Sequence, residues 1–176
     1  MVRRLDAEAP RLPRCPMADL DFGQRPNIIP WPPLIYVGAL AIAAALQYWI
    51  KFINLDALIG KIPVLAGVGL MVAGAGIDLV AMITLRRRGT TVLPHAGSKE
   101  LCTTGIYGLS RNPIYLGNSI AMAGLAAALR WSWLLLLVPV VAAAVTWLAI
   151  AREEEHLSRR FGGKFKDYCA HVRRWL

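Results

Sequence analysis

A polar stretch punctuated by glycines, residues 105–117, turns directly into a hydrophobic segment. Within it, Arg111, Asn112 and Pro113 predict a helix start, because proline at the first helical position gives up no needed N–H and pushes the preceding residue out of the helical region. The free amides of that helix end would face the loop, where they favour an electron-rich group such as a carboxylate. The stretch is therefore suited to hold an anionic group.

Glu153, Glu154 and Glu155 follow the last hydrophobic run and form the second group of side chains that could do chemistry. In a helix with about 100° per residue, Glu154 lies on the apolar, inward face. Glu155 stands four residues before Arg159 and is explained by a surface ion pair. The apolar stripe around Glu154 covers about 80° and consists of Trp147, Ile150, Glu154, Leu157 and Phe161.

The chain after this helix predicts a second, shorter one. Gly162 and Gly163 are expected to end the first helix, because glycine is common just past a helix end. An amphipathic helix follows, with basic residues on one face, which suits it to lie on a membrane surface or to cover a pocket. Its apolar face is formed by Phe165, Tyr168, Cys169, Val172 and Leu176.

The elements that must position these groups are membrane spans. Of the 176 residues 56% are hydrophobic and the mean hydropathy is +0.46, which is too apolar for an ordinary soluble domain. The apolar runs approach the roughly 17–25 residues that a spanning helix needs. The expected fold class is an all-α polytopic membrane helical bundle of about four spans, of which the third is the shortest. The spans are expected at 34–52, 62–85, 114–129 and 133–151.

The basic residues mark the two sides of the membrane. All but three of the 20 lysines and arginines fall in the N-terminal tail, in the loop between the second and third spans, or in the C-terminal segment. The exceptions are Lys51, Lys61 and Arg130, in the two opposite loops. The positive-inside rule therefore places both termini in the cytoplasm, at the inner membrane if the source is bacterial. It also accounts for the net charge of +9 without a nucleic-acid partner.

Small residues recur on two spans and predict close helix packing. Gly69, Ala73 and Gly76 form such a face on the second span, and the third span carries another. The third and fourth spans should form a hairpin because only 130–132 separate them, so the fourth span is expected to pack against the small-residue face of the third. The first two spans should form another hairpin across the loop at 54–61. The small-residue face of the third span consists of Gly117, Ala121, Gly124 and Ala128.

The first two spans each hold one further residue of interest. Tyr36 is expected to anchor the first span at the interface, and that span is interpreted as an anchor without chemistry. Asp78 in the second span is costly there. Since it lies about two turns from Arg86, a structural hydrogen bond and a role in the site both remain open.

No metal site is expected from the cysteine and histidine positions. Their spacings match neither a zinc motif nor a disulfide framework, and the cysteines are expected to be reduced thiols. The residues concerned are Cys15, Cys102, Cys169, His95, His156 and His171.

Short motifs follow one another over about residues 90–176: Thr91-Val92-Leu93-Pro94, Leu101 to Gly105 with Tyr107, Arg111-Asn112-Pro113-Ile114-Tyr115-Leu116-Gly117, Glu153-Glu154 with Leu157, Phe161-Gly162 with Tyr168, and Val172 to Trp175. In their order and spacing they resemble the superfamily of isoprenylcysteine carboxyl methyltransferases and phospholipid methyltransferases, which are integral membrane enzymes. Asn112 stands where the isoprenylcysteine enzymes usually have histidine, which leaves the acceptor open. Arg173 replaces an expected proline, which leaves open whether Arg173 or Arg174 is the functional terminal arginine.

Residues 1–30 are expected to form a polar cytoplasmic tail, and with this resemblance the membrane methyltransferase domain is expected at 31–176. The resemblance also implies S-adenosylmethionine as methyl donor, held on the cytoplasmic side by the ends of the third and fourth spans. Glu153 and Glu154 would accept the amino group of the donor, and Arg111 with the Pro113 helix start would hold its carboxylate. The expected cofactor-binding residues are Gly105, Tyr107, Asn112, Pro113, Tyr115, Leu116, Gly117, Glu153, Glu154 and Tyr168.

The expected partners are the lipid membrane and a lipophilic or small-molecule methyl acceptor, which could approach sideways between spans. Arg111, Gly124 and Arg174 are expected to contact the acceptor, and Arg111, Tyr115 and Glu154 to be catalytic. The identity of the acceptor and the oligomeric state stay open.

Three alternatives remain beside this interpretation. A membrane reductase with a nicotinamide cofactor shares a related C-terminal half, but such enzymes tend to have Asn-Tyr-Phe-Gly where this chain has 113–117. A non-catalytic membrane scaffold would make the polar loop incidental. Arg111 and Glu154 could also form a structural salt bridge that caps the hairpin.

Overall fold

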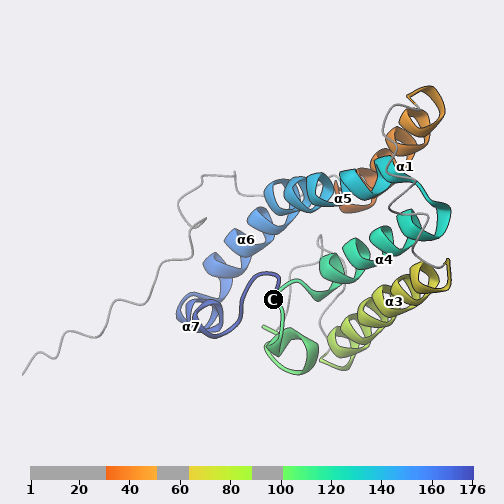
Figure 1. The fold of residues 1–176 in the computed structure, drawn as a ribbon. Helices are drawn as coiled ribbons and strands as arrows, with labels where there is room; N and C mark the ends of the chain where they lie inside the picture. The colour runs from red at the N-terminus through yellow and green to blue at the C-terminus, as the bar shows by residue number, and fades with distance from the viewer. Residues whose placement is uncertain (1–30, 51–63, 89–100) are drawn as a thin grey trace, which may run out of the picture.

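The computed structural model describes residues 31–50, 64–88 and 101–176, and no strand occurs among them. The predicted tail at 1–30 with Cys15, the loop at 54–61, and the segment 91–95 lie outside the described residues. Figure 1 shows the elements in order: α1 (Trp31–Trp49), α3 (Val64–Arg87), the 3-10 helix η1 (Gly105–Gly108), α4 (Pro113–Leu129), α5 (Ser132–Val145), the π-helix η2 (Thr146–Ile150), α6 (Ala151–Phe161) and α7 (Gly163–His171).

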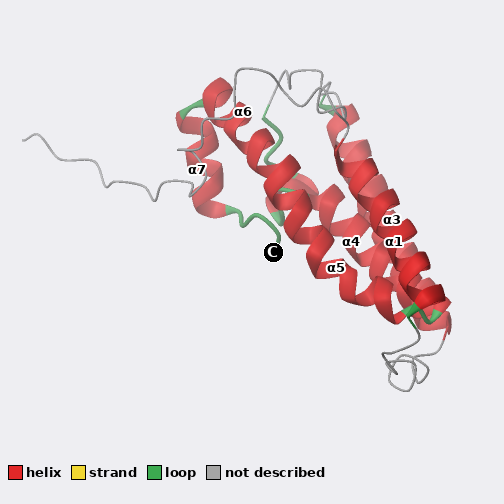
Figure 2. Cartoon of the chain, turned by 90° about the horizontal axis from the view of Figure 1, so that it is seen from above, coloured by secondary structure: helices red, strands yellow, loops and turns green. Residues whose placement is uncertain are grey.

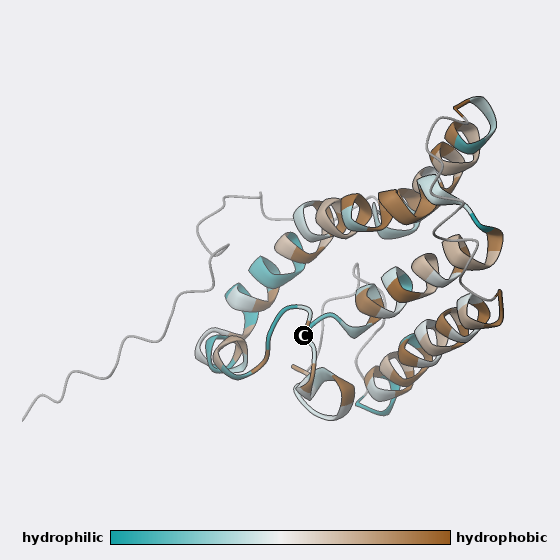
Figure 3. Cartoon of the chain, viewed as in Figure 1, coloured by the Kyte–Doolittle hydropathy of each residue, from teal (hydrophilic) through white to brown (hydrophobic). Residues whose placement is uncertain are grey.

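Three of the described helical segments are long and apolar enough to cross a membrane: Trp31–Trp49, Val64–Arg87 and the continuous Ser132–Phe161. α4 has 17 residues and is a shorter apolar helix. In Figure 3, apolar residues predominate on α1, α3, α4 and α5, whereas α6 carries many hydrophilic ones. The all-α membrane bundle is confirmed, and the third predicted span is the shortest, as expected. The fourth predicted span continues past 151 into α6.

The helices pack in the order α1, α5, α4, α3, each against the next (Figure 1). Figure 2 shows the same helices from above, with α6 and α7 at one end of the bundle. Ala39 and Ala43 of α1 join Leu134, Val141 and Val145 of α5 in the buried core. The prediction that the first two spans pack as a hairpin is wrong, because α1 packs chiefly against α5. A short connection keeps two helices near each other, but their apolar faces decide which neighbour they bury against.

Glycines bring the backbones of α3 and α4 into direct contact. A Cβ on Gly74 would lie 2.5 Å from the carbonyl oxygen of Gly117, and a Cβ on Gly124 would lie 2.6 Å from that of Gly67. The small-residue face of α4 therefore packs against α3. The prediction that the fourth span covers this face is wrong, although α4 also contacts α5, as the predicted hairpin of the third and fourth spans requires.

The predicted packing face of α3 is wrong. A Cβ on Gly69 or Gly76 would meet nothing within 4 Å, whereas Gly67 and Gly74 are buried against α4. The predicted pair, Gly69 and Gly76, and the packed pair, Gly67 and Gly74, lie on different faces of one helix and have the same seven-residue spacing. Spacing alone cannot choose between them, since the choice depends on what the neighbouring helix presents.

The π-helix η2 changes the predicted face of the carboxylate segment. Trp147 is 69% exposed, so its place in the predicted inward stripe is wrong, whereas Ile150 and Glu154 are buried. A π turn holds more residues than an α turn, so a 100° phase cannot be carried across Thr146–Ile150. Glu155 does pair with Arg159, but Glu155 is 7% exposed, which corrects its predicted surface position.

The last predicted helix is shorter than expected. Gly162 has φ of +52° and separates α6 from α7, as the glycine pair predicts. Phe165 and Tyr168 are buried, but α7 ends at His171 and Val172 is extended. Leu176 is exposed and does not belong to a helical face. Residues 172–176 return to the loop before α4, and we call them the C-terminal strap.

Candidate active site

The loop before α4 is fixed by its own hydrogen bonds. Gly105 has φ of +64°, a conformation that side-chain-bearing residues rarely adopt, at the start of η1. Asn112 precedes Pro113 at the helix start, as the sequence predicts. Its backbone N–H donates to Ser110 Oγ at 3.1 Å. The loop therefore enters α4 in a defined geometry and carries Arg111 in the middle of it.

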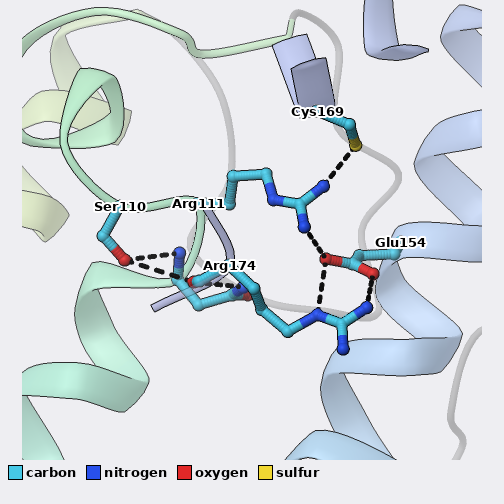
Figure 4. Close-up of polar contacts among 6 residues, drawn as sticks. Ser110, Arg111, Glu154, Cys169 and Arg174 are labelled. Atoms are coloured by element: carbon cyan, nitrogen blue, oxygen red, sulfur yellow. Dashed lines mark hydrogen bonds and ion pairs between the residues drawn. The ribbon is translucent and has the colours of Figure 1, made fainter. Parts of the chain in front are cut away.

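The C-terminal strap is bonded to this loop along its backbone (Figure 4). The Arg111 N–H donates to the Arg173 carbonyl at 3.0 Å. The Arg174 carbonyl accepts from Asn112 Nδ2 at 3.1 Å and from Ser110 Oγ at 3.3 Å. These bonds hold the last residues of the chain against the start of α4, and they place the Arg174 side chain beside α6.

Glu154 lies at the centre of the resulting charge cluster. Arg174 binds it with two nitrogens, Nη2 to Oε2 at 2.6 Å and Nε to Oε1 at 3.1 Å. Arg111 Nη2 lies 3.3 Å from Oε1, and its Nη1 contacts Cys169 Sγ. Glu154 is 5% exposed, so both guanidiniums neutralise one buried carboxylate. Of the two terminal arginines, Arg174 is the one whose side chain reaches the cluster.

Tyrosines form a second group beside Glu153. The Tyr115 hydroxyl donates to Glu153 Oε2 at 3.4 Å. The carbonyl of Tyr115 accepts from Ser119 Oγ at 2.8 Å and from the Tyr36 hydroxyl at 3.4 Å. α1 therefore contacts the site through Tyr36. This contact corrects the interpretation of the first span as an anchor alone.

η1 and α7 are joined by a tyrosine pair. The Tyr168 hydroxyl donates to the Tyr107 carbonyl at 2.6 Å, and both rings are buried. Burial raises the pKa of each hydroxyl well above its ordinary value, and Glu153 raises the pKa of Tyr107 further. Both hydroxyls are therefore neutral at physiological pH and can donate hydrogen bonds.

The structure thus brings most of the predicted site residues together, but two predicted glycines lie outside this group. Gly117 and Gly124 lie in the α3–α4 contact, where backbone atoms occupy the space that a side chain would need. We assign Gly124 to helix packing, so its contact with an acceptor is not retained. Gly105 is exposed and Leu116 is partly buried. The predicted residues in the site are Tyr107, Arg111, Asn112, Pro113, Tyr115, Glu153, Glu154, Tyr168 and Arg174.

Sequence reasoning missed three contributors. Tyr36 looked like an interface anchor because it stands near the start of a span. Ser110 and Cys169 were not predicted as site residues, since their contacts come from segments 64 and 58 residues away. No group of three or more His, Cys, Asp or Glu side chains that could hold a metal occurs in the described ranges.

Residues 62–164 match the phospholipid methyltransferase family, and this match covers more than half of the chain. The chain is similar to the nickel-cobalt-cadmium resistance protein NccN of Alcaligenes xylosoxydans xylosoxydans, with 38% identity over 72 residues. That similarity covers 41% of this chain and only 33% of the relative. No solved structure matches the chain.

Proposed function

Because the chain belongs to the phospholipid methyltransferase family, we propose that it is a membrane enzyme that transfers a methyl group from S-adenosylmethionine to a lipophilic or small acceptor. The observation that carries this proposal is that positively and negatively charged side chains lie together at one end of the bundle. Arg111 and Arg174 converge there on Glu154, and Glu153 lies in the preceding position.

The residues present fit the donor, which supplies an electrophilic methyl group on a cationic sulfur. Its amino-acid part needs a cation and an anion close together. Two guanidiniums against one carboxylate leave a positive charge for the donor carboxylate, and Glu153 can accept the ammonium group. The buried rings of Tyr107 and Tyr168 provide an apolar, hydrogen-bonded wall for the adenine.

The chain's own contribution to the chemistry is positioning and exclusion of water. The loop at 110–112 and the C-terminal strap fix Arg111 from both sides, and Tyr115 is held through its carbonyl and its hydroxyl. Fixed donors and acceptors of this kind can hold two reactants in line for transfer. Arg111 is proposed to orient the reacting group of the acceptor, with Tyr115 beside it.

The location of the site is part of the same proposal. The basic residues near it, on α6, α7 and the end of α3, favour the cytoplasmic side for this end of the bundle. Cysteine labelling in sealed vesicles tests the orientation. A thiol introduced at Lys164 should label from the cytoplasmic side and one at Arg130 from the opposite side. Labelling of both from one side would refute this topology.

Methyl transfer itself is tested with donor that carries a labelled methyl group. Membranes that contain the protein, incubated with this donor, should incorporate the label into an extractable molecule that mass spectrometry can identify. The matched control is Arg111→Ala, which should reduce turnover more than it reduces donor binding. If donor binds but the label is never transferred, the protein uses the molecule as a ligand and the enzyme proposal is wrong.

A further inference from the structure

Asn112 is the N-cap residue of α4, but its side chain does not cap the helix. Asparagine at this position typically accepts a hydrogen bond from a backbone N–H of the first turn. Among the described residues, the Asn112 side chain makes no such bond. Its Nδ2 donates instead to the Arg174 carbonyl at 3.1 Å. This buried amide therefore binds another segment of the chain, and helix formation does not account for it.

Ser110 makes a second bond to the same carbonyl (Figure 4). Its Oγ donates to the Arg174 carbonyl at 3.3 Å and accepts from the Asn112 N–H at 3.1 Å. A carbonyl oxygen has two lone pairs, so these two donors satisfy it completely. Ser110 is buried as well, so removal of its hydroxyl would leave polar partners without water to replace it. The two side chains thus fix the peptide that follows Arg174.

The residue held in this way carries the second guanidinium of the charge cluster. Arg174 Nε lies 3.1 Å from Glu154 Oε1, and Arg111 Nη2 lies 3.3 Å from the same oxygen. Two like charges at one oxygen repel each other, which opposes the attraction of each to the carboxylate. The bonds to the Arg174 carbonyl act on the backbone and keep the second guanidinium in place against this repulsion.

Arg174 is the more accessible of the two cations. Its side chain is 22% exposed, whereas that of Arg111 is 9% exposed. Its Nε and Nη2 bind Glu154, which leaves Nη1 for another acceptor. A guanidinium oriented by one carboxylate is suited to bind a second one, such as the carboxylate of the methyl donor.

We propose that Ser110 and Asn112 are positioning residues for donor binding: their side chains do not touch the donor, but hold the backbone of Arg174 so that its guanidinium meets the donor carboxylate. The inference rests on the proposed function and adds two residues to it. It also changes the role expected for Asn112, which the sequence placed among the cofactor contacts. The effect of either side chain on the donor should therefore pass through Arg174.

The strap has other attachments that a test must separate from these two bonds. Trp175 packs against the buried core cluster, and the Arg173 carbonyl accepts from the Arg111 N–H. If these contacts alone positioned Arg174, removal of the bonds from Ser110 and Asn112 would leave donor affinity unchanged.

Two probes distinguish an effect on Arg174 from an effect on the whole site. S-adenosylhomocysteine carries the amino-acid part of the donor, and methylthioadenosine lacks it. In calorimetry, Asn112→Leu should weaken S-adenosylhomocysteine binding roughly three- to ten-fold, the effect of about one hydrogen bond, and leave methylthioadenosine binding unchanged. Asn112→His keeps an N–H donor and should restore most of the affinity.

Three further variants complete the test. Ser110→Ala should act in the same direction as Asn112→Leu. Ser132→Ala is the matched control, because it removes an equally buried hydroxyl from the start of α5 at the other end of the bundle, and it should leave both affinities unchanged. In the Arg174→Ala background, Asn112→Leu should cause no further loss of S-adenosylhomocysteine affinity, because the guanidinium that it positions is already absent.

The proposal is overturned if Asn112→Leu weakens both probes equally, or if its effect adds to that of Arg174→Ala. Either result would show that Asn112 acts on the donor by another route. Unchanged S-adenosylhomocysteine affinity in Asn112→Leu also overturns it. Failure of both probes to bind the wild type would instead count against the proposed function.

Hydrogen exchange tests the positioning without any ligand. The Arg111 amide bonds to the Arg173 carbonyl, so its exchange rate reports how firmly the strap is attached. Asn112→Leu and Ser110→Ala should speed this exchange, whereas Ser132→Ala should not. A wild-type exchange rate in Asn112→Leu would overturn the proposal, whether or not the donor binds.

Discussion

Glu154→Gln should destabilise the protein much more than Glu155→Gln, although both carboxylates are buried and belong to one helix. Glu154 accepts three contacts from two arginines, whereas Glu155 pairs with Arg159, whose side chain is 50% exposed. A neutral amide keeps the shape of the acid, but it removes the charge and replaces one accepting oxygen with an NH2 group that cannot accept from arginine.

The magnitude follows from the contacts. A charge-assisted hydrogen bond is worth about 1.5–3 kcal/mol and a neutral one about 0.5–1.5 kcal/mol, so each contact that the amide oxygen keeps loses about 1 kcal/mol, and the contact at the NH2 group is lost altogether. If the NH2 group takes the place of Oε2, two weakened contacts and one lost contact give about 4 kcal/mol, and we expect about 3–4 kcal/mol because the Arg174 side chain is 22% exposed. The Glu155 pair, with its exposed arginine, should lose about 0–1 kcal/mol.

Denaturant unfolding in detergent, followed by helix content, gives the free energy of unfolding of each variant. Calorimetry with S-adenosylmethionine then measures the affinity of the donor, which should fall more in Glu154→Gln than in Glu155→Gln. Equal losses of stability in the two variants would refute the assignment of Glu154 as the centre of the charge cluster.

Three other changes test separate parts of the structure. Arg174→Ala should lower both the donor affinity and the stability of the protein, because its side chain binds Glu154. Arg173→Ala should change little, because Arg173 contacts the loop through its backbone carbonyl. Calorimetry measures the affinity of each variant and denaturant unfolding measures its stability. Gly74→Ala should cost about 1–3 kcal/mol of stability through its clash with α4, whereas Gly76→Ala meets open space and should be neutral. Burial raises the pKa of Tyr168, so stability should fall as pH rises above the ordinary tyrosine value of about 10, and Tyr168→Phe should weaken that dependence.

The sequence predicted those features that depend on local chemistry. Apolar run length indicated the membrane helices, and Pro113 indicated the start of α4. Gly162 marked the boundary between α6 and α7. These signals are local because a helix start, a helix end and a span each have requirements that a few consecutive residues meet or fail to meet.

The features that the sequence did not predict depend on contacts between distant segments. The stripe that contains Gly67 and Gly74 could not be preferred over the one with Gly69, because only the position of α4 distinguishes them. The π turn before α6 shifts the positions of the following residues around the helix axis, and no residue type in this turn predicts it. The bond from Arg174 to Glu154 requires the strap to leave the helix after His171 and turn back.

The central claim is that this end of the bundle binds a methyl donor, and calorimetry on the purified protein in mild detergent tests it most directly. S-adenosylmethionine and S-adenosylhomocysteine should both bind, since they share the amino-acid part that the arginines and glutamates recognise, and NADPH should not. Binding of NADPH without binding of either adenosyl ligand would contradict the claim and would favour a membrane reductase.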